Sequence, residues 1–167
     1  MVMAQEAGVF DSSKTIRALD QDEAMGVLKI ASDAGLVHSV SNNQQGLWYI
    51  CNCCTCSCGI LRGMKDLGVA NVVAASAFIN QVDEDLCIAC EACIDTCQFD
   101  ALAMGETVVQ VNQLRCVGCG VCVPACPEGA LSLVRRPEED VPKTPVTYQE
   151  WMEGRAAERE IDIQDVI

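Results

Sequence analysis

The sequence is poor in aromatic and basic residues and contains a single histidine. Aromatic residues make up 4 % of the 167-residue chain, so few large side chains can fill a core. Lys and Arg number 11 against 24 Asp and Glu, which gives a formal net charge of −13 at pH 7. Because this charge repels phosphate, we expect no nucleic-acid partner. With one histidine (His38), no Gly-rich phosphate loop and no catalytic-triad candidate, we expect no catalytic residues and no catalytic site of its own.

The chain also lacks a long hydrophobic run. The longest apolar stretch, Val69 to Ile79, is interrupted by Asn71 and Ser76, well short of the roughly 18 residues that span a membrane. The first residues, MVMAQEAGVFDSSK, show no basic n-region, apolar h-region or twin arginine. We therefore expect no membrane span and a location in a reducing cytoplasm, where cysteines stay reduced.

Cysteine is abundant, with 13 residues, and eight of them form one pattern twice. The spacing C-x2-C-x2-C-x3-C recurs after 29 residues and is the ligand pattern of two [4Fe–4S] clusters, which indicates electron transfer. Zinc knuckles or a disulfide framework would leave the third and fourth cysteines of each run unexplained. The eight are Cys87, Cys90, Cys93, Cys97, Cys116, Cys119, Cys122 and Cys126.

The spacing predicts ligand sets that cross between the two copies. Two-residue gaps let one loop place three thiolates around one cluster. We expect the fourth cysteine to begin a helix that leads away and so to reach the other cluster. The predicted sets are Cys87, Cys90, Cys93 and Cys126 for cluster 1, and Cys97, Cys116, Cys119 and Cys122 for cluster 2.

The duplication extends beyond the ligands. Small residues at Ala89, Gly118 and Gly120 allow backbone N–H groups to approach the inorganic sulfides, and aliphatic neighbours exclude water; both effects tune the reduction potential. One position differs between the copies. Cys126 is followed by proline, whereas Cys97 is followed by Gln98, which keeps its backbone N–H.

A second cysteine-rich run places five cysteines within eight residues: Cys51, Cys53, Cys54, Cys56 and Cys58. Three interpretations stay open: a third [4Fe–4S] cluster held by four of the five, a zinc or other metal site, and a redox-active thiol centre with its own chemistry. We favour the third cluster, because eight plus four ligands leaves one spare among 13. Ligation could begin with Cys51 and Cys54 or with Cys53 and Cys56. Adjacent thiols on extended backbone point in opposite directions, so Cys53 or Cys54 is the expected spare.

The remaining segments predict an α+β fold: a two-[4Fe–4S] ferredoxin-like domain with a small helical N-terminal extension and an extended C-terminal arm. Helices are expected from Asp20 to Gly35 and over GILRGMKDLG, and strands over FINQV and ALSLVRR with a hairpin in MGETVVQVN. A short apolar strand is expected after the turn region SNNQQG. The predicted domains are residues 1–80, the extension with the third site; 81–136, the dicluster ferredoxin; and 137–167, the Pro-rich acidic arm. With so few large side chains, the metal-free chain should be poorly folded.

The C-terminal arm carries Pro137, Pro142 and Pro145, followed by a charged segment with a possible helix. Tyr148 and Trp151 have no obvious core to enter. Either disorder or a segment that wraps a larger partner fits this composition.

From about Asp22 to Val134 the chain resembles a family of iron–sulfur proteins. The matching features are the helix end Ala34-Gly35-Leu36-Val37-His38, the run Cys51-Asn52-Cys53-Cys54-Thr55-Cys56 and the two ferredoxin motifs. Family members often carry a further cysteine where this chain has Ser57. The chain is most similar to the small iron–sulfur subunits of tungsten-dependent class II benzoyl-CoA reductases. That resemblance implies three [4Fe–4S] clusters, a tungsten-pterin partner of the aldehyde oxidoreductase type, further electron-carrier subunits and an anaerobic host.

Three functions therefore compete. The first is a non-catalytic electron-transfer subunit of a larger oxidoreductase complex. The second is a free, diffusible ferredoxin, which would need neither the N-terminal extension nor the arm. The third is a catalytic or sensory centre at Cys51–Cys58.

Overall fold

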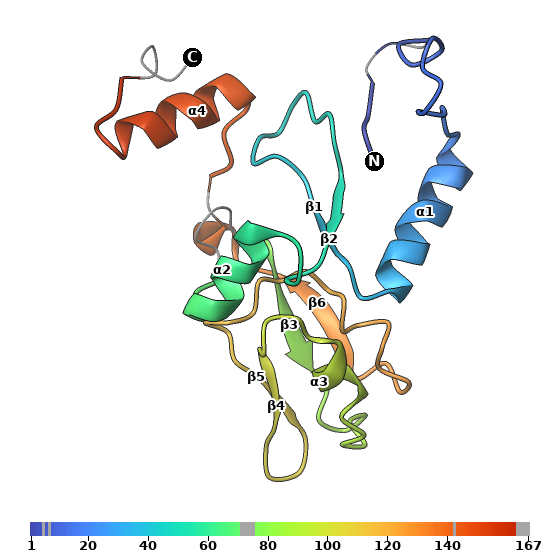
Figure 1. The fold of residues 1–167 in the computed structure, drawn as a ribbon. Coiled ribbons are helices and arrows are strands. Elements are labelled where there is room, and N and C mark those ends of the chain that lie inside the picture. The colour runs from blue at the N-terminus through green and yellow to red at the C-terminus, as the bar shows by residue number, and fades with distance from the viewer. Residues whose placement is uncertain (5, 7, 71–75, 142, 163–167) are drawn as a thin grey trace. The chain divides into compact units, whose positions relative to one another are not determined.

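The computed structural model describes residues 1–4, 6, 8–70, 76–141 and 143–162, and Figure 1 shows the fold. The elements in chain order are α1 (Gln21–Asp33), β1 (Val37–Ser39), β2 (Cys51–Cys53), α2 (Gly59–Leu67), β3 (Phe78–Val82), α3 (Ala92–Thr96), β4 (Leu102–Met104), β5 (Val109–Val111), β6 (Leu131–Arg135), a 3-10 turn (Glu138–Asp140) and α4 (Tyr148–Ala157). None of the described helices has the length and apolar character needed to cross a bilayer.

The chain divides into two compact units, each assembled from separate segments. The first unit combines Met1–Leu19, Ser39–Cys51 and Lys143–Ile167. The second combines Asp20–His38 and Asn52–Pro142. The sequence predicts three domains that are consecutive stretches of chain, and that division stays a prediction.

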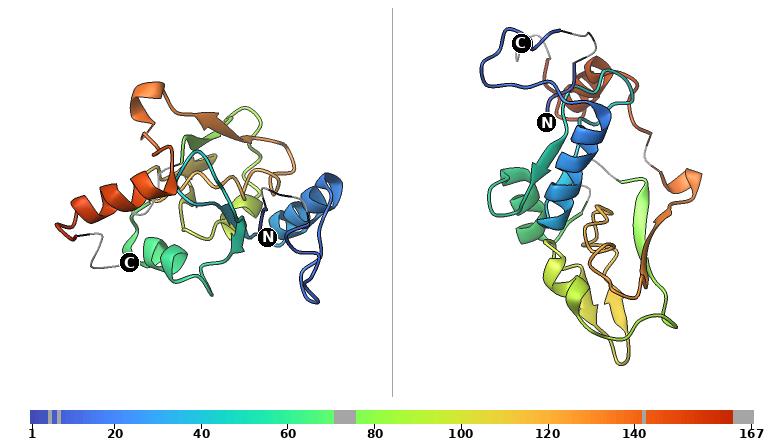
Figure 2. Two further views of the ribbon diagram at one scale, coloured as in Figure 1. Left: turned by 90° about the horizontal axis from the view of Figure 1, so that it is seen from above. Right: turned by 90° about the vertical axis from the view of Figure 1, so that its right-hand side faces the viewer.

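The second unit contains two antiparallel strand pairs. Strand β3 pairs with β6, from Phe78 opposite Arg135 to Val82 opposite Leu131 (Figure 2). Strand β4 pairs with β5 in a hairpin, in which the Gly105 N–H donates to the Val108 carbonyl at 2.9 Å. The predicted strands FINQV and ALSLVRR and the predicted hairpin are therefore confirmed.

Both predicted N-terminal helices are present, with ends set by local chemistry. At α1 the Asp20 carboxylate accepts from the Glu23 N–H at 2.8 Å and the Glu23 carboxylate accepts from the Asp20 N–H at 3.1 Å, a capping box. Gly35 follows the helix in the left-handed conformation, with φ 71°. Of the apolar side chains of α1, Ala31 is buried whereas Val27 is exposed.

The internal repeat is visible in the turns that precede the two cysteine loops. The Asp83 carboxylate accepts from the N–H groups of Asp85 and Leu86. Twenty-nine residues later, the Asn112 side-chain oxygen accepts from the N–H groups of Leu114 and Arg115 in the same arrangement. Each copy therefore enters its cysteine loop through the same side-chain-stabilised turn.

The core of the second unit consists of two apolar clusters in which cysteines are members. The first contains Val37, Leu61, Phe99, Ala101, Cys116 and Val121. The second contains Cys93, Leu102, Val109, Cys122 and Leu131. Cys97 and Val111 pack against both clusters, so the two are continuous.

In the first unit, the chain start and the C-terminal arm contact the segment of residues 39–51. Val2 forms an isolated antiparallel bridge with Tyr49. This bridge replaces the expected strand after SNNQQG, and the strand that forms, β2, begins only at Cys51. The N–H groups of Gln44 and Gln45 donate to the Val146 carbonyl at 3.2 and 2.9 Å. The expected helix in the arm is confirmed as α4, while the wrapping of a partner stays a prediction.

Candidate metal centres

The first candidate centre is a hollow lined by cysteines from both copies of the repeat. Three come from the first loop and one from the second, and Val82, Val109 and Leu131 supply apolar walls. We call this the first hollow; its cysteines are Cys87, Cys90, Cys93 and Cys126. This grouping matches the set that sequence spacing predicts for cluster 1, and its role as a ligand set stays a prediction.

A second hollow has the complementary composition. Its lining includes Asn80, Phe99 and Leu102, and its cysteines are Cys97, Cys116, Cys119 and Cys122. Each hollow thus contains three cysteines from one loop and the last cysteine of the other. Four thiolates in a largely apolar setting form the donor set of a [4Fe–4S] cluster, so the residues present fit that group.

The path of the chain between the hollows differs from the sequence expectation in one respect. Cys97 does not begin a helix; it follows the end of the one-turn helix α3, which contains Cys93. Residues 98–100 form a turn and not a helix, so the one-turn helix lies before the crossing cysteine. This single turn carries the chain from the first hollow to the second.

The backbone of each loop takes the left-handed conformation at two matched positions. In the first loop these are Ala89 (φ 55°) and Glu91 (φ 63°), and in the second Gly118 (φ 66°) and Gly120 (φ 74°). A Cβ atom on Gly118 would lie 2.2 Å from the Phe78 carbonyl oxygen, so only glycine fits there. In the second loop, the expected small residue at position 118 is therefore required by the lack of space for a side chain.

Backbone N–H groups donate to the crossing cysteines in both copies. The Ala101 N–H lies 3.4 Å from Cys97 Sγ, and the Ala130 N–H lies 3.3 Å from Cys126 Sγ. A side chain supplies a third donor, because Asn80 Nδ2 lies 3.1 Å from Cys122 Sγ. Sequence reasoning missed Asn80, since β3 precedes the cysteine loops and no spacing rule connects it with the second one.

Burial makes several of these thiols hard to ionise without metal. Desolvation, followed by the nearby thiols of Cys119, Cys97 and Cys116, raises the pKa of Cys122 to about 12. Desolvation also raises the pKa of Cys119 and of Cys93. Since metal binds the thiolate, these sites release protons when iron is loaded.

The five cysteines of the N-terminal run take different positions. Cys54 and Cys56 are joined in a disulfide, and Cys51, Cys53 and Cys58 lie outside that disulfide. A four-thiolate set drawn from this run therefore requires the disulfide to be reduced. Cys58 is the N-cap of α2, so the helix start lies at the run, as the sequence predicts.

Side chains of the second unit hold this run in place. Arg62 donates to the carbonyl groups of Thr55 and Cys56. His38 Nδ1 donates to the Asn52 side-chain oxygen at 2.6 Å, which gives the single histidine a structural contact. Lys65, on the same helix as Arg62, forms an ion pair with Asp100, with 3.7 Å between Lys65 Nζ and Asp100 Oδ1.

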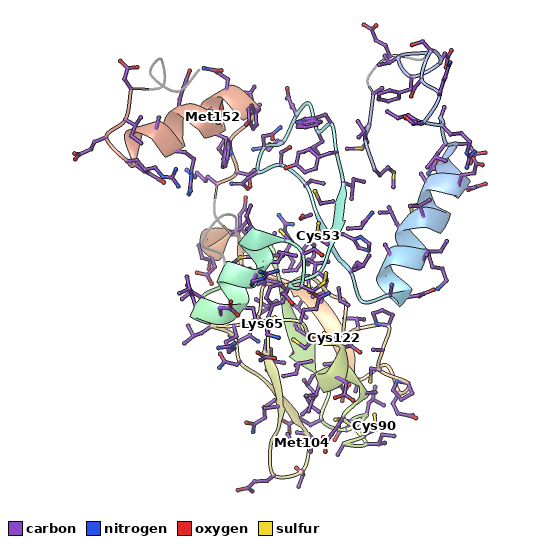
Figure 3. The ribbon with its side chains drawn as sticks, viewed as in Figure 1. Cys53, Lys65, Cys90, Met104, Cys122 and Met152 are labelled. Atoms are coloured by element: carbon purple, nitrogen blue, oxygen red, sulfur yellow. A yellow bond between two sulfur atoms is a disulfide. The ribbon has the colours of Figure 1, made fainter. Side chains whose placement is uncertain are left out.

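Residues 52–58 of the run belong to the second unit and lie beside the second hollow, whereas Cys51 ends a segment of the first unit. Cys53 and Cys58 pack against the apolar cluster that includes Cys116, as do Cys97 and Cys119. Figure 3 labels one cysteine from each group, Cys53, Cys122 and Cys90, and shows them in that order along the unit.

Gln98, at the position where the other copy has proline, makes two contacts with N-terminal segments. Its Oε1 accepts from the Thr55 N–H at 2.7 Å, and its Nε2 donates to the Gly35 carbonyl. The sequence showed that this position differs between copies but not what it contacts.

The two loops differ in exposure. In the first loop Cys90 is exposed, and Leu86 and Ile88 are 48 % and 62 % exposed. In the second loop Cys116 is buried. Taken together, the cysteines that line the first hollow are therefore more exposed than those that line the second, of which Cys116 and Cys122 are buried.

The described residues contain no group of three or more His, Cys, Asp or Glu side chains arranged to hold a single metal ion. The thiolates of a [4Fe–4S] cluster bind four separate irons and surround the cluster, so they do not converge on one point.

Comparison with known proteins agrees with this description. Residues 80–133 match a family described as 4Fe-4S dicluster domain. No curated protein matches the chain. The family match supports a dicluster domain of the ferredoxin type, with at least two [4Fe–4S] clusters and a role in iron–sulfur electron transfer.

Proposed function

We propose that this protein is an electron-transfer subunit of a larger oxidoreductase and carries a line of iron–sulfur centres. The observation that supports it best is the pair of hollows, each lined by four cysteines that cross between the repeats. A [4Fe–4S] cluster in each hollow supplies one-electron exchange. Because Cys93 and Cys97 belong to different hollows yet lie four residues apart, the two sites are close neighbours.

A third cluster, held by four of the five cysteines in the N-terminal run, completes the proposal. Packing supports its place, since Cys53 and Cys58 pack against the apolar cluster that contains Cys116. The cysteine groups then follow the order N-terminal run, second hollow, first hollow. The second hollow, whose cysteines are the more buried, is the middle of this series.

The exposed first loop is the expected point of exchange with another redox protein. Leu86, Ile88 and Cys90 are exposed there, and Asp83, Glu84 and Asp85 precede the loop. With a chain charge of −13, a partner with a basic docking face is favoured.

The identity of the partner follows from sequence resemblance alone. On that basis we propose a tungsten-pterin subunit of the aldehyde oxidoreductase type, as in class II benzoyl-CoA reductase, in the cytoplasm of an anaerobe. Native extract tests this directly: the protein should elute with a larger tungsten-containing subunit. Elution as a free protein near 17.9 kDa would favour a diffusible ferredoxin instead.

Iron and acid-labile sulfide analysis tests the number of centres. Anaerobically purified protein should contain about twelve irons per chain, with three cubane signals in EPR of the reduced protein. About eight irons with one zinc would contradict the third cluster and leave the two hollows intact.

The disulfide favours a second candidate function for the N-terminal run. Cys54 and Cys56 could act as a dithiol–disulfide pair that exchanges two electrons and two protons with a thiol partner. Thiol counting after mild reduction distinguishes the two: two extra thiols with no gain of iron on reconstitution supports this pair, and a gain of four irons supports the cluster.

A further inference from the structure

We propose that Asn80 tunes the reduction potential of the cluster in the second hollow and makes it higher than that in the first. The inference rests on the proposed occupancy of both hollows. It concerns a residue outside every cysteine motif, placed by β3 against a cysteine 42 residues further along the chain.

The side chain of Asn80 is buried and its amide nitrogen faces Cys122. It is 2 % exposed, its Nδ2 lies 3.1 Å from Cys122 Sγ, and it lines the second hollow. Its Oδ1 has no hydrogen-bond partner among the described residues. A buried amide with one unpaired end is less favourable than an apolar side chain of similar size, so packing alone does not explain asparagine here.

The backbone holds the amide in position. Asn80 pairs with Leu133 of β6, and its carbonyl accepts from Gln113 Nε2 at 3.0 Å. Gln113 lies in the turn that leads into the second cysteine loop, so this bond links β3 directly to that loop.

The internal repeat supplies a comparison within the same molecule. Twenty-nine residues after Asn80 is Val109, which is 3 % exposed and lines the first hollow. The backbone donors Ala101 and Ala130 serve the two crossing cysteines alike. The two repeats therefore differ in hydrogen bonding at this position, because residue 80 offers an amide donor to its hollow and residue 109 offers only methyl groups.

The sign of the effect follows from charge. Reduction adds one electron to the cluster and makes its thiolates more negative, and an N–H donor stabilises that state. The site with the extra donor should accept an electron at higher potential. Electrons on the full-length protein would then reside first at the second hollow.

Exchanging the two residues tests this on the loaded, full-length protein. Anaerobic redox titrations followed by EPR would compare wild type with Asn80→Val and, separately, with Val109→Asn. We expect Asn80→Val to lower the higher of the two dicluster midpoint potentials and leave the lower one in place. Val109→Asn should raise the lower potential, so the two variants shift different signals.

Each contrary result has a distinct meaning. Two clusters in Asn80→Val with unchanged potentials would overturn the proposal, as would both variants shifting the same signal. If Asn80→Val fails to load, the Val109→Asn titration still decides, because it adds a donor without removing one. A wild-type protein without two clusters would instead contradict the proposed function.

Discussion

At the scale of single residues, the two cysteine loops have the same backbone conformation at matched positions but differ in the side chains that fit there. Ala89 and Gly118 are matched, and both are left-handed. The sequence predicts small residues at both sites because N–H groups must approach a cluster. It does not predict that the Phe78 carbonyl presses on Gly118, because that contact depends on how β3 packs against the loop.

Gly118→Ala should therefore disrupt the second loop, with Ala89→Gly as the matched control. The new Cβ would lie 2.2 Å from the Phe78 carbonyl oxygen and 2.8 Å from Ser76 Oγ. Relief of this overlap costs about 1–3 kcal/mol of overpacking in addition to the left-handed strain. We expect loss of about four irons per chain in Gly118→Ala and full loading in Ala89→Gly. Equal iron content in both variants would contradict this account.

At the scale of elements, local signals predicted most helices and strands. The capping box of α1, the left-handed glycines after α1 and α2, and the hairpin at Gly105 are all readable from sequence. The packing of the N-terminal run beside the second hollow was not, because it depends on contacts between residues such as Thr55 and Gln98, 43 apart in sequence. The contact between Asn80 and Cys122 could not be predicted for the same reason, because these residues are 42 apart in sequence.

Gln98→Pro should loosen the N-terminal run while leaving both hollows able to bind iron. It gives the first repeat the residue that follows Cys126 in the second, and it removes two hydrogen bonds of about 1 kcal/mol each. Hydrogen exchange over residues 52–58 should accelerate about 10-fold or more. Gln81→Ala, an exposed glutamine of β3, serves as the control. Unchanged exchange in Gln98→Pro would show that the contact is dispensable.

At the scale of the whole molecule, cysteine replaces much of the aromatic core. Cysteines belong to both apolar clusters of the second unit, and no large side chain among the described residues is less than 2 % exposed. The sequence anticipated this through its low aromatic content. The stability of such a core depends on the iron–sulfur clusters that its cysteine thiolates would bind.

Removal of iron under reducing conditions should therefore unfold the second unit. We expect loss of cooperative thermal unfolding and of protection from hydrogen exchange in β3, β5 and β6. Reconstitution with iron and sulfide should restore both. Metal-free protein that still unfolded cooperatively at the same Tm would show that the fold is independent of the clusters.

The crossing of ligands between the repeats is the central claim, and EPR-monitored redox titration of three serine variants tests it most directly. Cys90→Ser and Cys126→Ser should alter the same cluster signal, because both cysteines line the first hollow. Cys119→Ser should alter the other signal. If Cys126→Ser instead changed the signal that Cys119→Ser changes, each loop would hold its own cluster and the crossed arrangement would be wrong.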